Sequence, residues 1–302
     1  LVFVSRVLNF ALNVAGFDRV EDRIDDVAER REQLLEELGV WTDAWEPPGT
    51  SPVEYLDRLS TIKVPTLILV GDHDFFELLE QWVEELAVAC RAAGYDYLGV
   101  TDHSQAAAYA GGLRPDDLAR QADEIDEVNA RLEGFRVLKG IEADILQDGR
   151  VDYDEQVLER LDFVIASVHS RFNMGEKDMT ARILAAMDNP FLTIIGHPTG
   201  RLLLSRDPYP IDLDAVMEKA AATGVALEIN ADPHRLDLDW RVLRKAKESG
   251  VTISIGADAH SVAGIGYVEY GVGMARKGWL GPDDILNARP VGNFIAYARR
   301  RR

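Results

Sequence analysis

Short runs of hydrophobic and β-branched residues alternate with longer amphipathic segments from about residue 64 to residue 255. The short runs are typical of buried strands, whereas apolar residues in the longer segments recur with the period of a helix. The predicted strands are Thr66–Val70, Tyr97–Thr101, Arg136–Gly140, Phe163–Val168, Leu192–Ile195, Ala226–Ile229 and Val251–Ile255. The predicted helices are Gln81–Ala93, Arg114–Leu132, Tyr153–Arg160, Thr180–Met187, Asp212–Thr223 and Asp239–Ser249.

Strands that alternate with helices predict an α/β fold with a parallel sheet. The seven strand units lack a glycine-rich phosphate-binding fingerprint, and this favours a seven-stranded (β/α) barrel over a doubly wound sheet. A chain of 302 residues, 47% of them hydrophobic, can bury a sizeable core. We therefore expect one large domain, or one domain with an extension.

The composition restricts the partners and the compartment. A formal net charge of −19 argues against strong autonomous DNA binding, because neutralising phosphates requires clustered lysine and arginine. The single cysteine, Cys90, lies in a predicted helix where we expect plain packing, and it indicates a reducing compartment such as the cytoplasm. The apolar residues 1–17 are interrupted by polar side chains, so we expect an amphipathic or buried helix there and no membrane span.

Side chains that bind metals follow one predicted strand after another. In parallel barrels the carboxyl ends of the strands form one face, and that face carries the chemistry. Imidazole and carboxylate groups are ligands of zinc and manganese, so the pattern predicts a multi-metal site. His234, in a turn-rich loop, is assigned a loop role. The residues that follow strands are His73, His103, Glu142, His169, His197, Asn230, Asp258 and His260.

Five short motifs resemble those of the PHP (polymerase and histidinol phosphatase) superfamily. They are Thr101-Asp102-His103-Ser104, Gly140-Ile141-Glu142, Ser167-Val168-His169-Ser170, Gly196-His197-Pro198 and Asp258-Ala259-His260. The stretches "LDFVIASVHSRFNM", "GHPTGRLLLSRDPY", "LEINADPHRLDLDW" and "YGVGMARKGWL" resemble the C-terminal PHP domain of bacterial family X DNA polymerases. The resemblance covers roughly residues 82–302.

The resemblance implies a distorted seven-stranded β/α barrel with three divalent ions, Mn²⁺ or Zn²⁺, that hydrolyses phosphoesters as a 3′–5′ exonuclease or related phosphodiesterase. Glu142 would be the bridging carboxylate, and His169 and His197 would complete one metal site with it. Asp258 would contribute to a second site, and His103 with His260 to a third. Glu142, Asp258 and His260 are the predicted catalytic residues. Metal-activated water would replace a protein nucleophile.

Arginines that follow two of the predicted ligands are candidates for substrate binding. Arg171 and Arg201 come just after His169 and His197, and a guanidinium can bind a phosphate through two hydrogen bonds. The alternative for each is a surface ion pair.

The first motif departs from the family pattern, which has His-x-His at the end of the first strand. Here the chain reads "LILVGDHDFF", with Asp72 and Asp74 in place of the imidazoles. In one interpretation these carboxylates substitute as ligands, because alternate strand residues point the same way. Carboxylates would favour harder ions such as Mn²⁺ or Mg²⁺. The one metal site expected to be intact is that of Glu142, His169 and His197.

In the other interpretation, the amino-terminal part is foreign. Residues 60–76 resemble a late strand and acid loop of an α/β-hydrolase, although a nucleophile elbow is absent. Residues 46–52 ("EPPGTSP") are typical of a linker, and the charged segment before them of a solvated helix. We therefore expect a helical extension and linker over residues 1–60, and a PHP-like barrel with an altered first strand over 61–302.

The sequence thus predicts a metal-dependent phosphoesterase whose substrate is a phosphoester, with a nucleic-acid 3′ end among the candidates. Two alternatives remain open. One is a catalytically impaired metal-binding module, and the other is a phosphatase of small phosphomonoesters. An α/β-hydrolase activity is disfavoured because the chain lacks the nucleophile motif.

Overall fold

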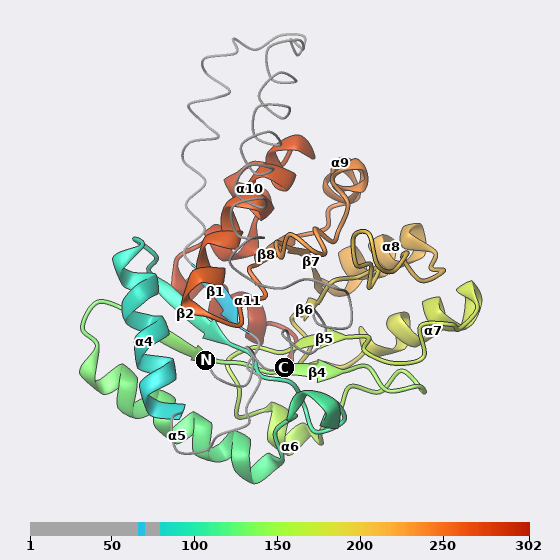
Figure 1. Cartoon of the computed structure of the whole chain (residues 1–302). Helices are drawn as coiled ribbons and strands as arrows, with labels where there is room; N and C mark the ends of the chain where they lie inside the picture. Colours follow the sequence, from blue (N-terminus) through green and yellow to red (C-terminus); the bar gives the residue numbers. More distant parts are fainter. Residues whose placement is uncertain (1–65, 70–78) are drawn as a thin grey trace, which may run out of the picture. The chain divides into compact units, whose positions relative to one another are not determined.

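Parallel strands form two sheets in the part of the chain that the computed structural model describes, which is residues 66–69 and 79–302 (Figure 1). The first sheet has the order β1 (Thr66–Leu69), β2 (Tyr97–Val100), β3 (Arg136–Lys139). The second sheet has the order β4 (Glu142–Asp144), β5 (Ile165–Ser167), β6 (Ile194–Ile195), β7 (Ala226–Asn230), β8 (Ile253–Gly256). All neighbouring strands in both sheets pair in parallel, which confirms the predicted α/β fold with parallel sheets.

A short bridge after β2 joins the two sheets. The backbone N–H of Ser104 donates to the carbonyl of Glu142 over 3.0 Å, and the N–H of Glu142 donates to the carbonyl of Asp102 over 2.9 Å. Gly140, between β3 and β4, lies against the ring of Phe163, and a Cβ atom there would lie 2.5 Å from its Cζ atom. The chain can therefore turn from one sheet into the other at Gly140, which brings Glu142 beside the residues that follow β2.

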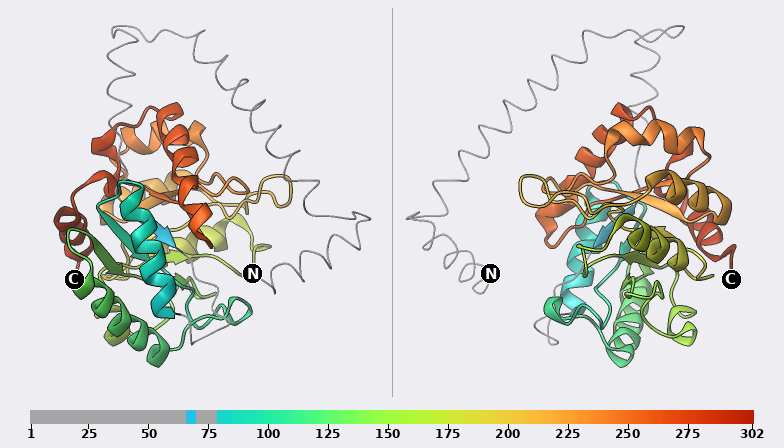
Figure 2. Two further views of the ribbon diagram at one scale, coloured as in Figure 1. Left: turned by 60° about the vertical axis from the view of Figure 1, so that its left-hand side comes forward. Right: turned by 90° about the vertical axis from the view of Figure 1, so that its right-hand side faces the viewer.

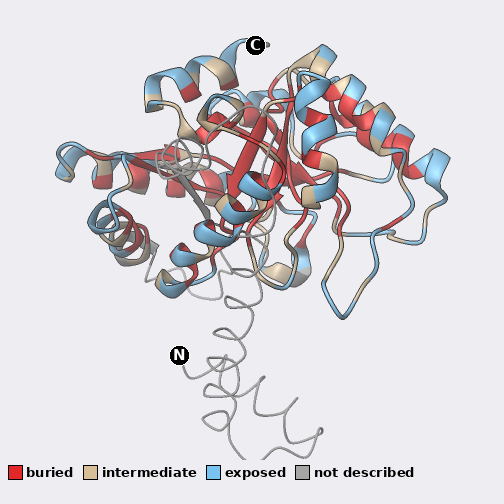
Figure 3. Cartoon of the chain, turned by 90° about the horizontal axis from the view of Figure 1, so that it is seen from above, coloured by how far each residue is buried: buried red, intermediate tan, exposed pale blue. Residues whose placement is uncertain are grey.

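Helices cover the sheets on the outside, and Figure 3 shows their buried faces turned towards the buried strands. Helix boundaries follow from local signals: α5 begins with a proline whose missing N–H needs no partner, and the carboxylate of Asp212 caps the first turn of α8. The helices are α4 (Leu79–Ala92), α5 (Pro115–Arg131), α6 (Glu155–Leu158), α7 (Glu176–Ala186), α8 (Leu213–Thr223), α9 (Trp240–Glu248), α10 (Val268–Lys277) and α11 (Val291–Arg299). Short 3₁₀ segments are Ala108–Ala110, Val262–Tyr267, Pro282–Asp284 and Leu286–Ala288.

The predicted strands and helices are present, with differences at several elements. Helix α6 is a single turn, shorter than the predicted Tyr153–Arg160. Strand β4 and helices α10 and α11 were not predicted. Strand β4 reads Glu-Ala-Asp, which lacks the hydrophobic pattern of a strand. Cys90 is buried in α4, as expected for a packing residue, and burial raises the pKa of its thiol to about 12.

A hydrophobic cluster closes the sheets at the amino ends of their strands. Phe294 of α11 contacts Tyr97 and Phe163 with ring centroids 5.7 and 5.4 Å apart, and the hydroxyl of Tyr97 donates to the carbonyl of Arg289. The cluster includes the first residue of β2, β5, β6 and β7. The carboxyl ends of the strands, opposite this cluster, are left to the loops that carry the predicted ligands.

Several predictions lie outside the described residues. They are the amino-terminal helix, the charged helix and linker before residue 53, the hydrolase-like loop, and Asp72, His73 and Asp74. No helix in the described part of the chain has the length and apolar character needed to cross a membrane.

Candidate metal centre

Three predicted ligands meet beside the carboxyl ends of β5 and β6. Glu142 begins β4, whereas His169 and His197 stand two residues after β5 and β6. The Oε1 atom of Glu142 lies 3.3 Å from Nε2 of His169 and 3.0 Å from Nε2 of His197. The three side chains are 4%, 7% and 3% exposed, so water competes little for them.

The spacing of these atoms fits a divalent ion. Ligands about 2.0–2.2 Å from one zinc ion lie about 3.3 Å from one another in a tetrahedron, and slightly closer in an octahedron. Both measured separations fall in this range, and the donors are two imidazole nitrogens and one carboxylate oxygen. Within the described residues, this is one of two groups whose donor atoms lie close enough to share an ion.

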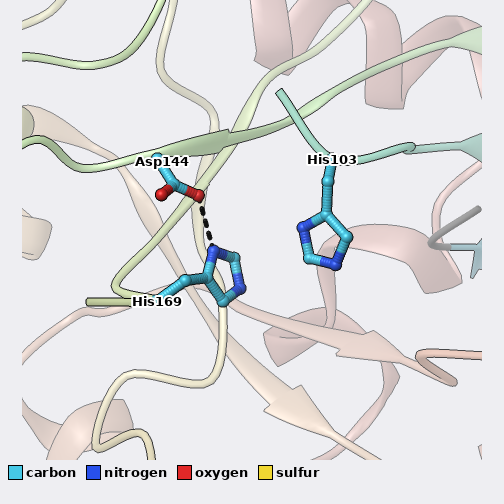
Figure 4. A group of neighbouring side chains, drawn as sticks. All are labelled: His103, Asp144 and His169. Carbon is cyan, nitrogen blue, oxygen red and sulfur yellow. Dashed lines mark hydrogen bonds and ion pairs between the residues drawn. The ribbon is translucent and has the colours of Figure 1, made fainter. Parts of the chain in front are cut away.

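Asp144 orients His169, as Figure 4 shows. The Nδ1 atom of His169 lies 2.7 Å from Oδ1 of Asp144, so Nδ1–H donates to the carboxylate and Nε2 is turned towards Glu142. A carboxylate behind a ligating histidine fixes its tautomer and raises its basicity. Asp144 was not among the predicted site residues, although its position two residues after Glu142 in a strand places it on the same face.

Burial and the neighbouring charges set the protonation of the group. Burial alone would raise the pKa of Glu142, but His169 and His197 outweigh it and hold that pKa well below its usual range. Burial would lower the pKa of His169, yet Glu142 and Asp144 raise it to about 9. Burial and then the positive charge of Arg235 lower the pKa of His197, so this imidazole is neutral and can bind a cation.

His103 lies on the other side of His169. The two rings pack edge to face with centroids 4.8 Å apart, and Nδ1 of His103 lies 3.6 Å from Oε2 of Glu142 (Figure 4). His103, Asp144 and His169 form the second group whose donor atoms could share an ion. Glu142 therefore faces His103 with one oxygen and His169 and His197 with the other, which is the arrangement of a carboxylate between two cation positions.

Asp258 and His260 follow β8 but are not part of either group. The Oδ2 atom of Asp258 accepts a hydrogen bond from Nδ2 of Asn230 over 2.9 Å and lies 3.3 Å from Nε of Arg235. His260 is exposed, and its Nδ1 atom lies 2.9 Å from the carbonyl oxygen of Asp258. The predicted partner pair His103 and His260 does not share either of the two groups.

Glu228 is a further buried carboxylate that the sequence reasoning missed. Its Oε2 atom accepts the backbone N–H of His197 over 2.7 Å, and Nδ2 of Asn230 lies 3.4 Å away. Burial and then the negative charge of Asp258 raise the pKa of Glu228 to about 8. Its place in β7, two residues before Asn230, is the signal that could have revealed it, because both side chains lie on one face of the strand.

The arginines divide into two kinds. Arg201 donates from Nε to the carbonyl of Arg235 over 2.9 Å and from Nη1 to Asp239 over 2.7 Å, and Nη2 donates to the carbonyl of Leu236. Its guanidinium thus holds the loop after β7. Arg235, which was not predicted, has a buried Nη1 atom without a hydrogen-bond partner beside Asp258. Arg171 is exposed and makes no ion pair with the described residues.

Two of the predicted ligands have left-handed backbone. The φ angles of His197 and Asp258 are +25° and +51°, a region that non-glycine residues rarely adopt. Such conformations cluster at functional sites, where the surrounding structure enforces them. Asp72 and Asp74 lie outside the described residues, so their relation to Asp258 stays a prediction.

Most of this chain is similar in sequence to part of a bacterial DNA polymerase. It is 47% identical over 218 residues to the DNA polymerase/3′-5′ exonuclease PolX of Bacillus subtilis, which covers 72% of this chain and 38% of that protein. A probable phosphatase of Caldanaerobacter subterraneus is 39% identical over 104 residues, which are 33% of this chain and 39% of the relative. The chain thus spans about two fifths of the length of these relatives.

Other comparisons add less. No family model matches the chain. A structure of histidinol phosphate phosphatase from Lactococcus lactis, in complex with zinc, L-histidinol and phosphate, aligns with a TM-score of 0.45 at 16% identity over 71% of this chain and 94% of that one. The sequence relatives and the five motifs, of which four supply residues of the two clustered groups, confirm the resemblance of the chain to the PHP superfamily.

Proposed function

We propose that this chain is a metal-dependent phosphoesterase that hydrolyses phosphodiesters, a nucleic-acid 3′ end among them, with metal-activated water. The observation that carries the proposal is the approach of Glu142 Oε1 to the Nε2 atoms of His169 and His197 at ligand spacing in a buried site. The name of the Bacillus relative, a 3′-5′ exonuclease, supports the choice of substrate.

In this proposal residues 61–302 form a distorted seven-stranded PHP-type barrel, with a separate extension over residues 1–60. Strands β3 and β4 are separated only by Gly140 and Ile141, so they count as one interrupted strand. The eight named strands then correspond to seven units, as the barrel requires. His169 and His197 follow the ends of β5 and β6, and Glu142 begins β4 beside them.

The residues of the site have distinct roles in the proposed reaction. A divalent ion, Mn²⁺ or Zn²⁺, held by Glu142, His169 and His197 would supply an activated water and neutralise charge on the phosphoryl oxygens. Asp144 keeps the proton of His169 on Nδ1 and so keeps Nε2 available. Burial of the group excludes bulk water and strengthens each electrostatic interaction.

Asp258 and His260 remain proposed ligands of further ions, with His103 and, in place of the missing imidazoles, Asp72 and Asp74. Asn230 and Arg235 both engage Oδ2 of Asp258, which leaves Oδ1 to face a cation. That three of the proposed ligands form a complete group by themselves also favours a second candidate function, a metal-binding module without turnover.

For substrate binding we propose Arg171 and Arg235. Arg171 is exposed and makes no ion pair with the residues that the structure describes, and the Nη1 atom of Arg235, beside Asp258, has no hydrogen-bond partner among them. The proposal gives Arg201 a supporting role, because a substrate phosphate would have to displace its three bonds to the loop after β7. Phosphate binding by guanidinium groups is strong because it is charged and bidentate.

The test combines metal counting with hydrolysis. Metal content of wild type and Glu142→Gln is measured by inductively coupled plasma mass spectrometry, with exposed Glu133→Gln as the matched control. Hydrolysis of bis(p-nitrophenyl) phosphate and of a 3′-ended oligonucleotide is followed with Mn²⁺ and with Zn²⁺. We expect bound metal and hydrolysis in wild type and in the control, and loss of both in Glu142→Gln. Bound metal without hydrolysis would favour the binding module, and absence of metal from wild type would refute both functions.

A further inference from the structure

Three large exposed hydrophobic side chains lie on segments that follow β6 and β8. Of the four large hydrophobic residues that are exposed in the described part of the chain, Val88 lies on the outer helix α4. The other three are Leu203 and Leu204, in the loop after β6, and Tyr270, near the start of α10. Leu204 is fully exposed, and Leu203 and Tyr270 are 39% and 38% exposed.

The two leucines form the tip of a tight turn. Leu202 and Arg206 exchange two backbone hydrogen bonds of 2.8 Å, and Leu204 has a φ of +62°. A left-handed leucine fully in water combines an unfavourable backbone with unburied apolar surface. Both views in Figure 2 show the segment after β6, drawn in gold, projecting from the body of the domain.

The turn is anchored to the metal centre at its base. The N–H of Gly200 donates to the carbonyl of His197 over 2.9 Å, and Nε of Arg206 donates to the carbonyl of Gly200 over 2.9 Å. Leu204 lies four residues beyond Gly200, so the chain between them can place Leu204 at most about 13 Å from Gly200. This is the length of the last few nucleotides of a strand, whose stacked bases are about 3.4 Å apart.

An aromatic pair lies beyond a neighbouring loop. The rings of Tyr267 and Tyr270, on the segment that follows His260, have centroids 6.2 Å apart. A Cβ atom at Gly271, the residue after Tyr270, would lie 2.9 Å from the Cβ atom of Ala231, which places the start of α10 against the loop after β7. The same loop is joined to the leucine turn, because the N–H of Leu203 donates to the carbonyl of His234 over 2.6 Å.

The chemistry of this surface fits single-stranded nucleic acid. Such strands offer a flat base and a phosphate at each step, and proteins hold them with stacking side chains and cations. The leucine turn and the tyrosine pair offer apolar and aromatic surface, and Arg171 offers an unpaired cation after His169. A protein partner typically covers about 800 Å² on each side, far more than three exposed side chains provide.

We propose that the Leu203–Leu204 turn and the Tyr267–Tyr270 pair, here named the apolar rim, bind the bases of single-stranded nucleic acid whose terminal phosphodiester lies at the metal centre. The proposal rests on the proposed function, since it assigns a polymeric substrate to the same site. It gives the rim a role in selecting that substrate, and none in hydrolysis of a small diester that does not reach beyond the metal ligands.

The test compares a polymeric with a small substrate in the full chain. The double variant Leu203→Ser with Leu204→Ser and the variant Tyr270→Ser are assayed beside Val88→Ser, a matched loss of exposed apolar surface on α4. We expect kcat/KM for a single-stranded oligonucleotide to fall on the order of tenfold or more in the rim variants. With bis(p-nitrophenyl) phosphate, all variants should stay within about twofold of wild type, because this small diester at the metal centre does not extend to the rim.

An equal decrease in kcat/KM for both substrates, or no decrease for the oligonucleotide, would refute the proposed role of the apolar rim. Anisotropy of a 5′-labelled phosphorothioate oligonucleotide on metal-loaded protein separates this outcome from failure of the proposed function. If wild type cleaves neither substrate, weaker oligonucleotide binding by the rim variants would still support the rim, and unchanged binding would refute it. A change in oligomeric state in the leucine variant, measured by light scattering, would identify the rim as a protein interface and also refute it.

Discussion

Replacing Asp144 with asparagine tests how the metal centre is organised. In the structure Asp144 accepts the Nδ1–H of His169 over 2.7 Å, and both side chains are 7% exposed. Asparagine keeps the size and an acceptor oxygen but removes the charge. Removing such a partner behind a ligating histidine typically costs 10–100-fold in metal affinity, or about 1.4–2.7 kcal/mol.

The expected loss depends on pH, because Asp144 also affects the proton that the ion must displace. The carboxylates of Glu142 and Asp144 raise the pKa of His169 to about 9, so near pH 7 a proton competes with the ion for Nε2. Asp144→Asn lowers that pKa and weakens the competition. We therefore expect a loss that approaches about 10–100-fold near pH 9, where His169 is half deprotonated in wild type and more fully deprotonated in Asp144→Asn, and a smaller loss near pH 7.

The assay is competition for Zn²⁺ against a fluorescent chelator whose own pH dependence is known, from pH 7 to pH 9. The exposed Asp148→Asn, which carries the same change in a neighbouring turn, is the control and should bind as wild type does. A ratio of wild-type to Asp144→Asn affinity that is constant with pH would refute the effect of Asp144 on the pKa of His169, and a ratio near one at every pH would refute the orienting role. A loss above about 1,000-fold at every pH would instead make Asp144 a direct ligand, with His103 and His169.

Three further predictions follow from the same structure. The pKa of His169 is raised to about 9 in the folded protein, so its protonation stabilises the metal-free fold below about pH 6.5, and this stabilisation is lost as pH rises through 9. Urea unfolding in the presence of a chelator should show that the free energy of unfolding decreases by up to about 3 kcal/mol between these pH values, and an increase would contradict the raised pKa of His169. Arg235→Lys should raise KM for a phosphodiester about tenfold, as expected for loss of a bidentate contact, while Arg201→Lys should chiefly lower Tm; the reverse pattern would exchange their roles. Phe294→Ala should lower the free energy of unfolding by about 3–5 kcal/mol in urea titrations and leave the metal content of the folded protein unchanged, because the ring lies in the cluster at the opposite ends of the strands; loss of metal would contradict that separation.

The sequence predicted those parts of the fold that depend on local pattern. Buried strands such as β2 and β6 consist of consecutive apolar residues, and their burial on both faces explains why they stand out. Strand β4 was missed because it begins with Glu142 and ends with Asp144, two buried acids that serve the site and break the hydrophobic pattern. Helix α11 was missed because it follows the last predicted strand, beyond the alternation of strands and helices.

The candidate ligands could be predicted because histidine is rare in this chain and follows strand after strand. The supporting residues could not be predicted in the same way. Asp144 acts on His169, 25 positions away, and Arg201 acts on the loop of Arg235, 34 positions away. These relations depend on which loops are neighbours in space. No residue pattern within a single loop contains that information.

The charges around the ligands bear on the proposed second cation position. Glu142, Glu228 and Asp258 are all buried, and the charges of Asp258 and Glu142 are among the causes that raise the pKa of Glu228 to about 8. An ion beside His169 and His197 compensates Glu142, which these imidazoles already stabilise. Burial and then the charge of Asp258 raise the pKa of Glu228, so Glu228 retains a proton near pH 7, although the Nε atom of Arg235 lies 3.3 Å from Oδ2 of Asp258. A second cation at Asp258 would offset the part of this effect that comes from Asp258, so ionisation of Glu228 would be coupled to filling the part of the site for which Asp72 and Asp74 are the proposed remaining ligands.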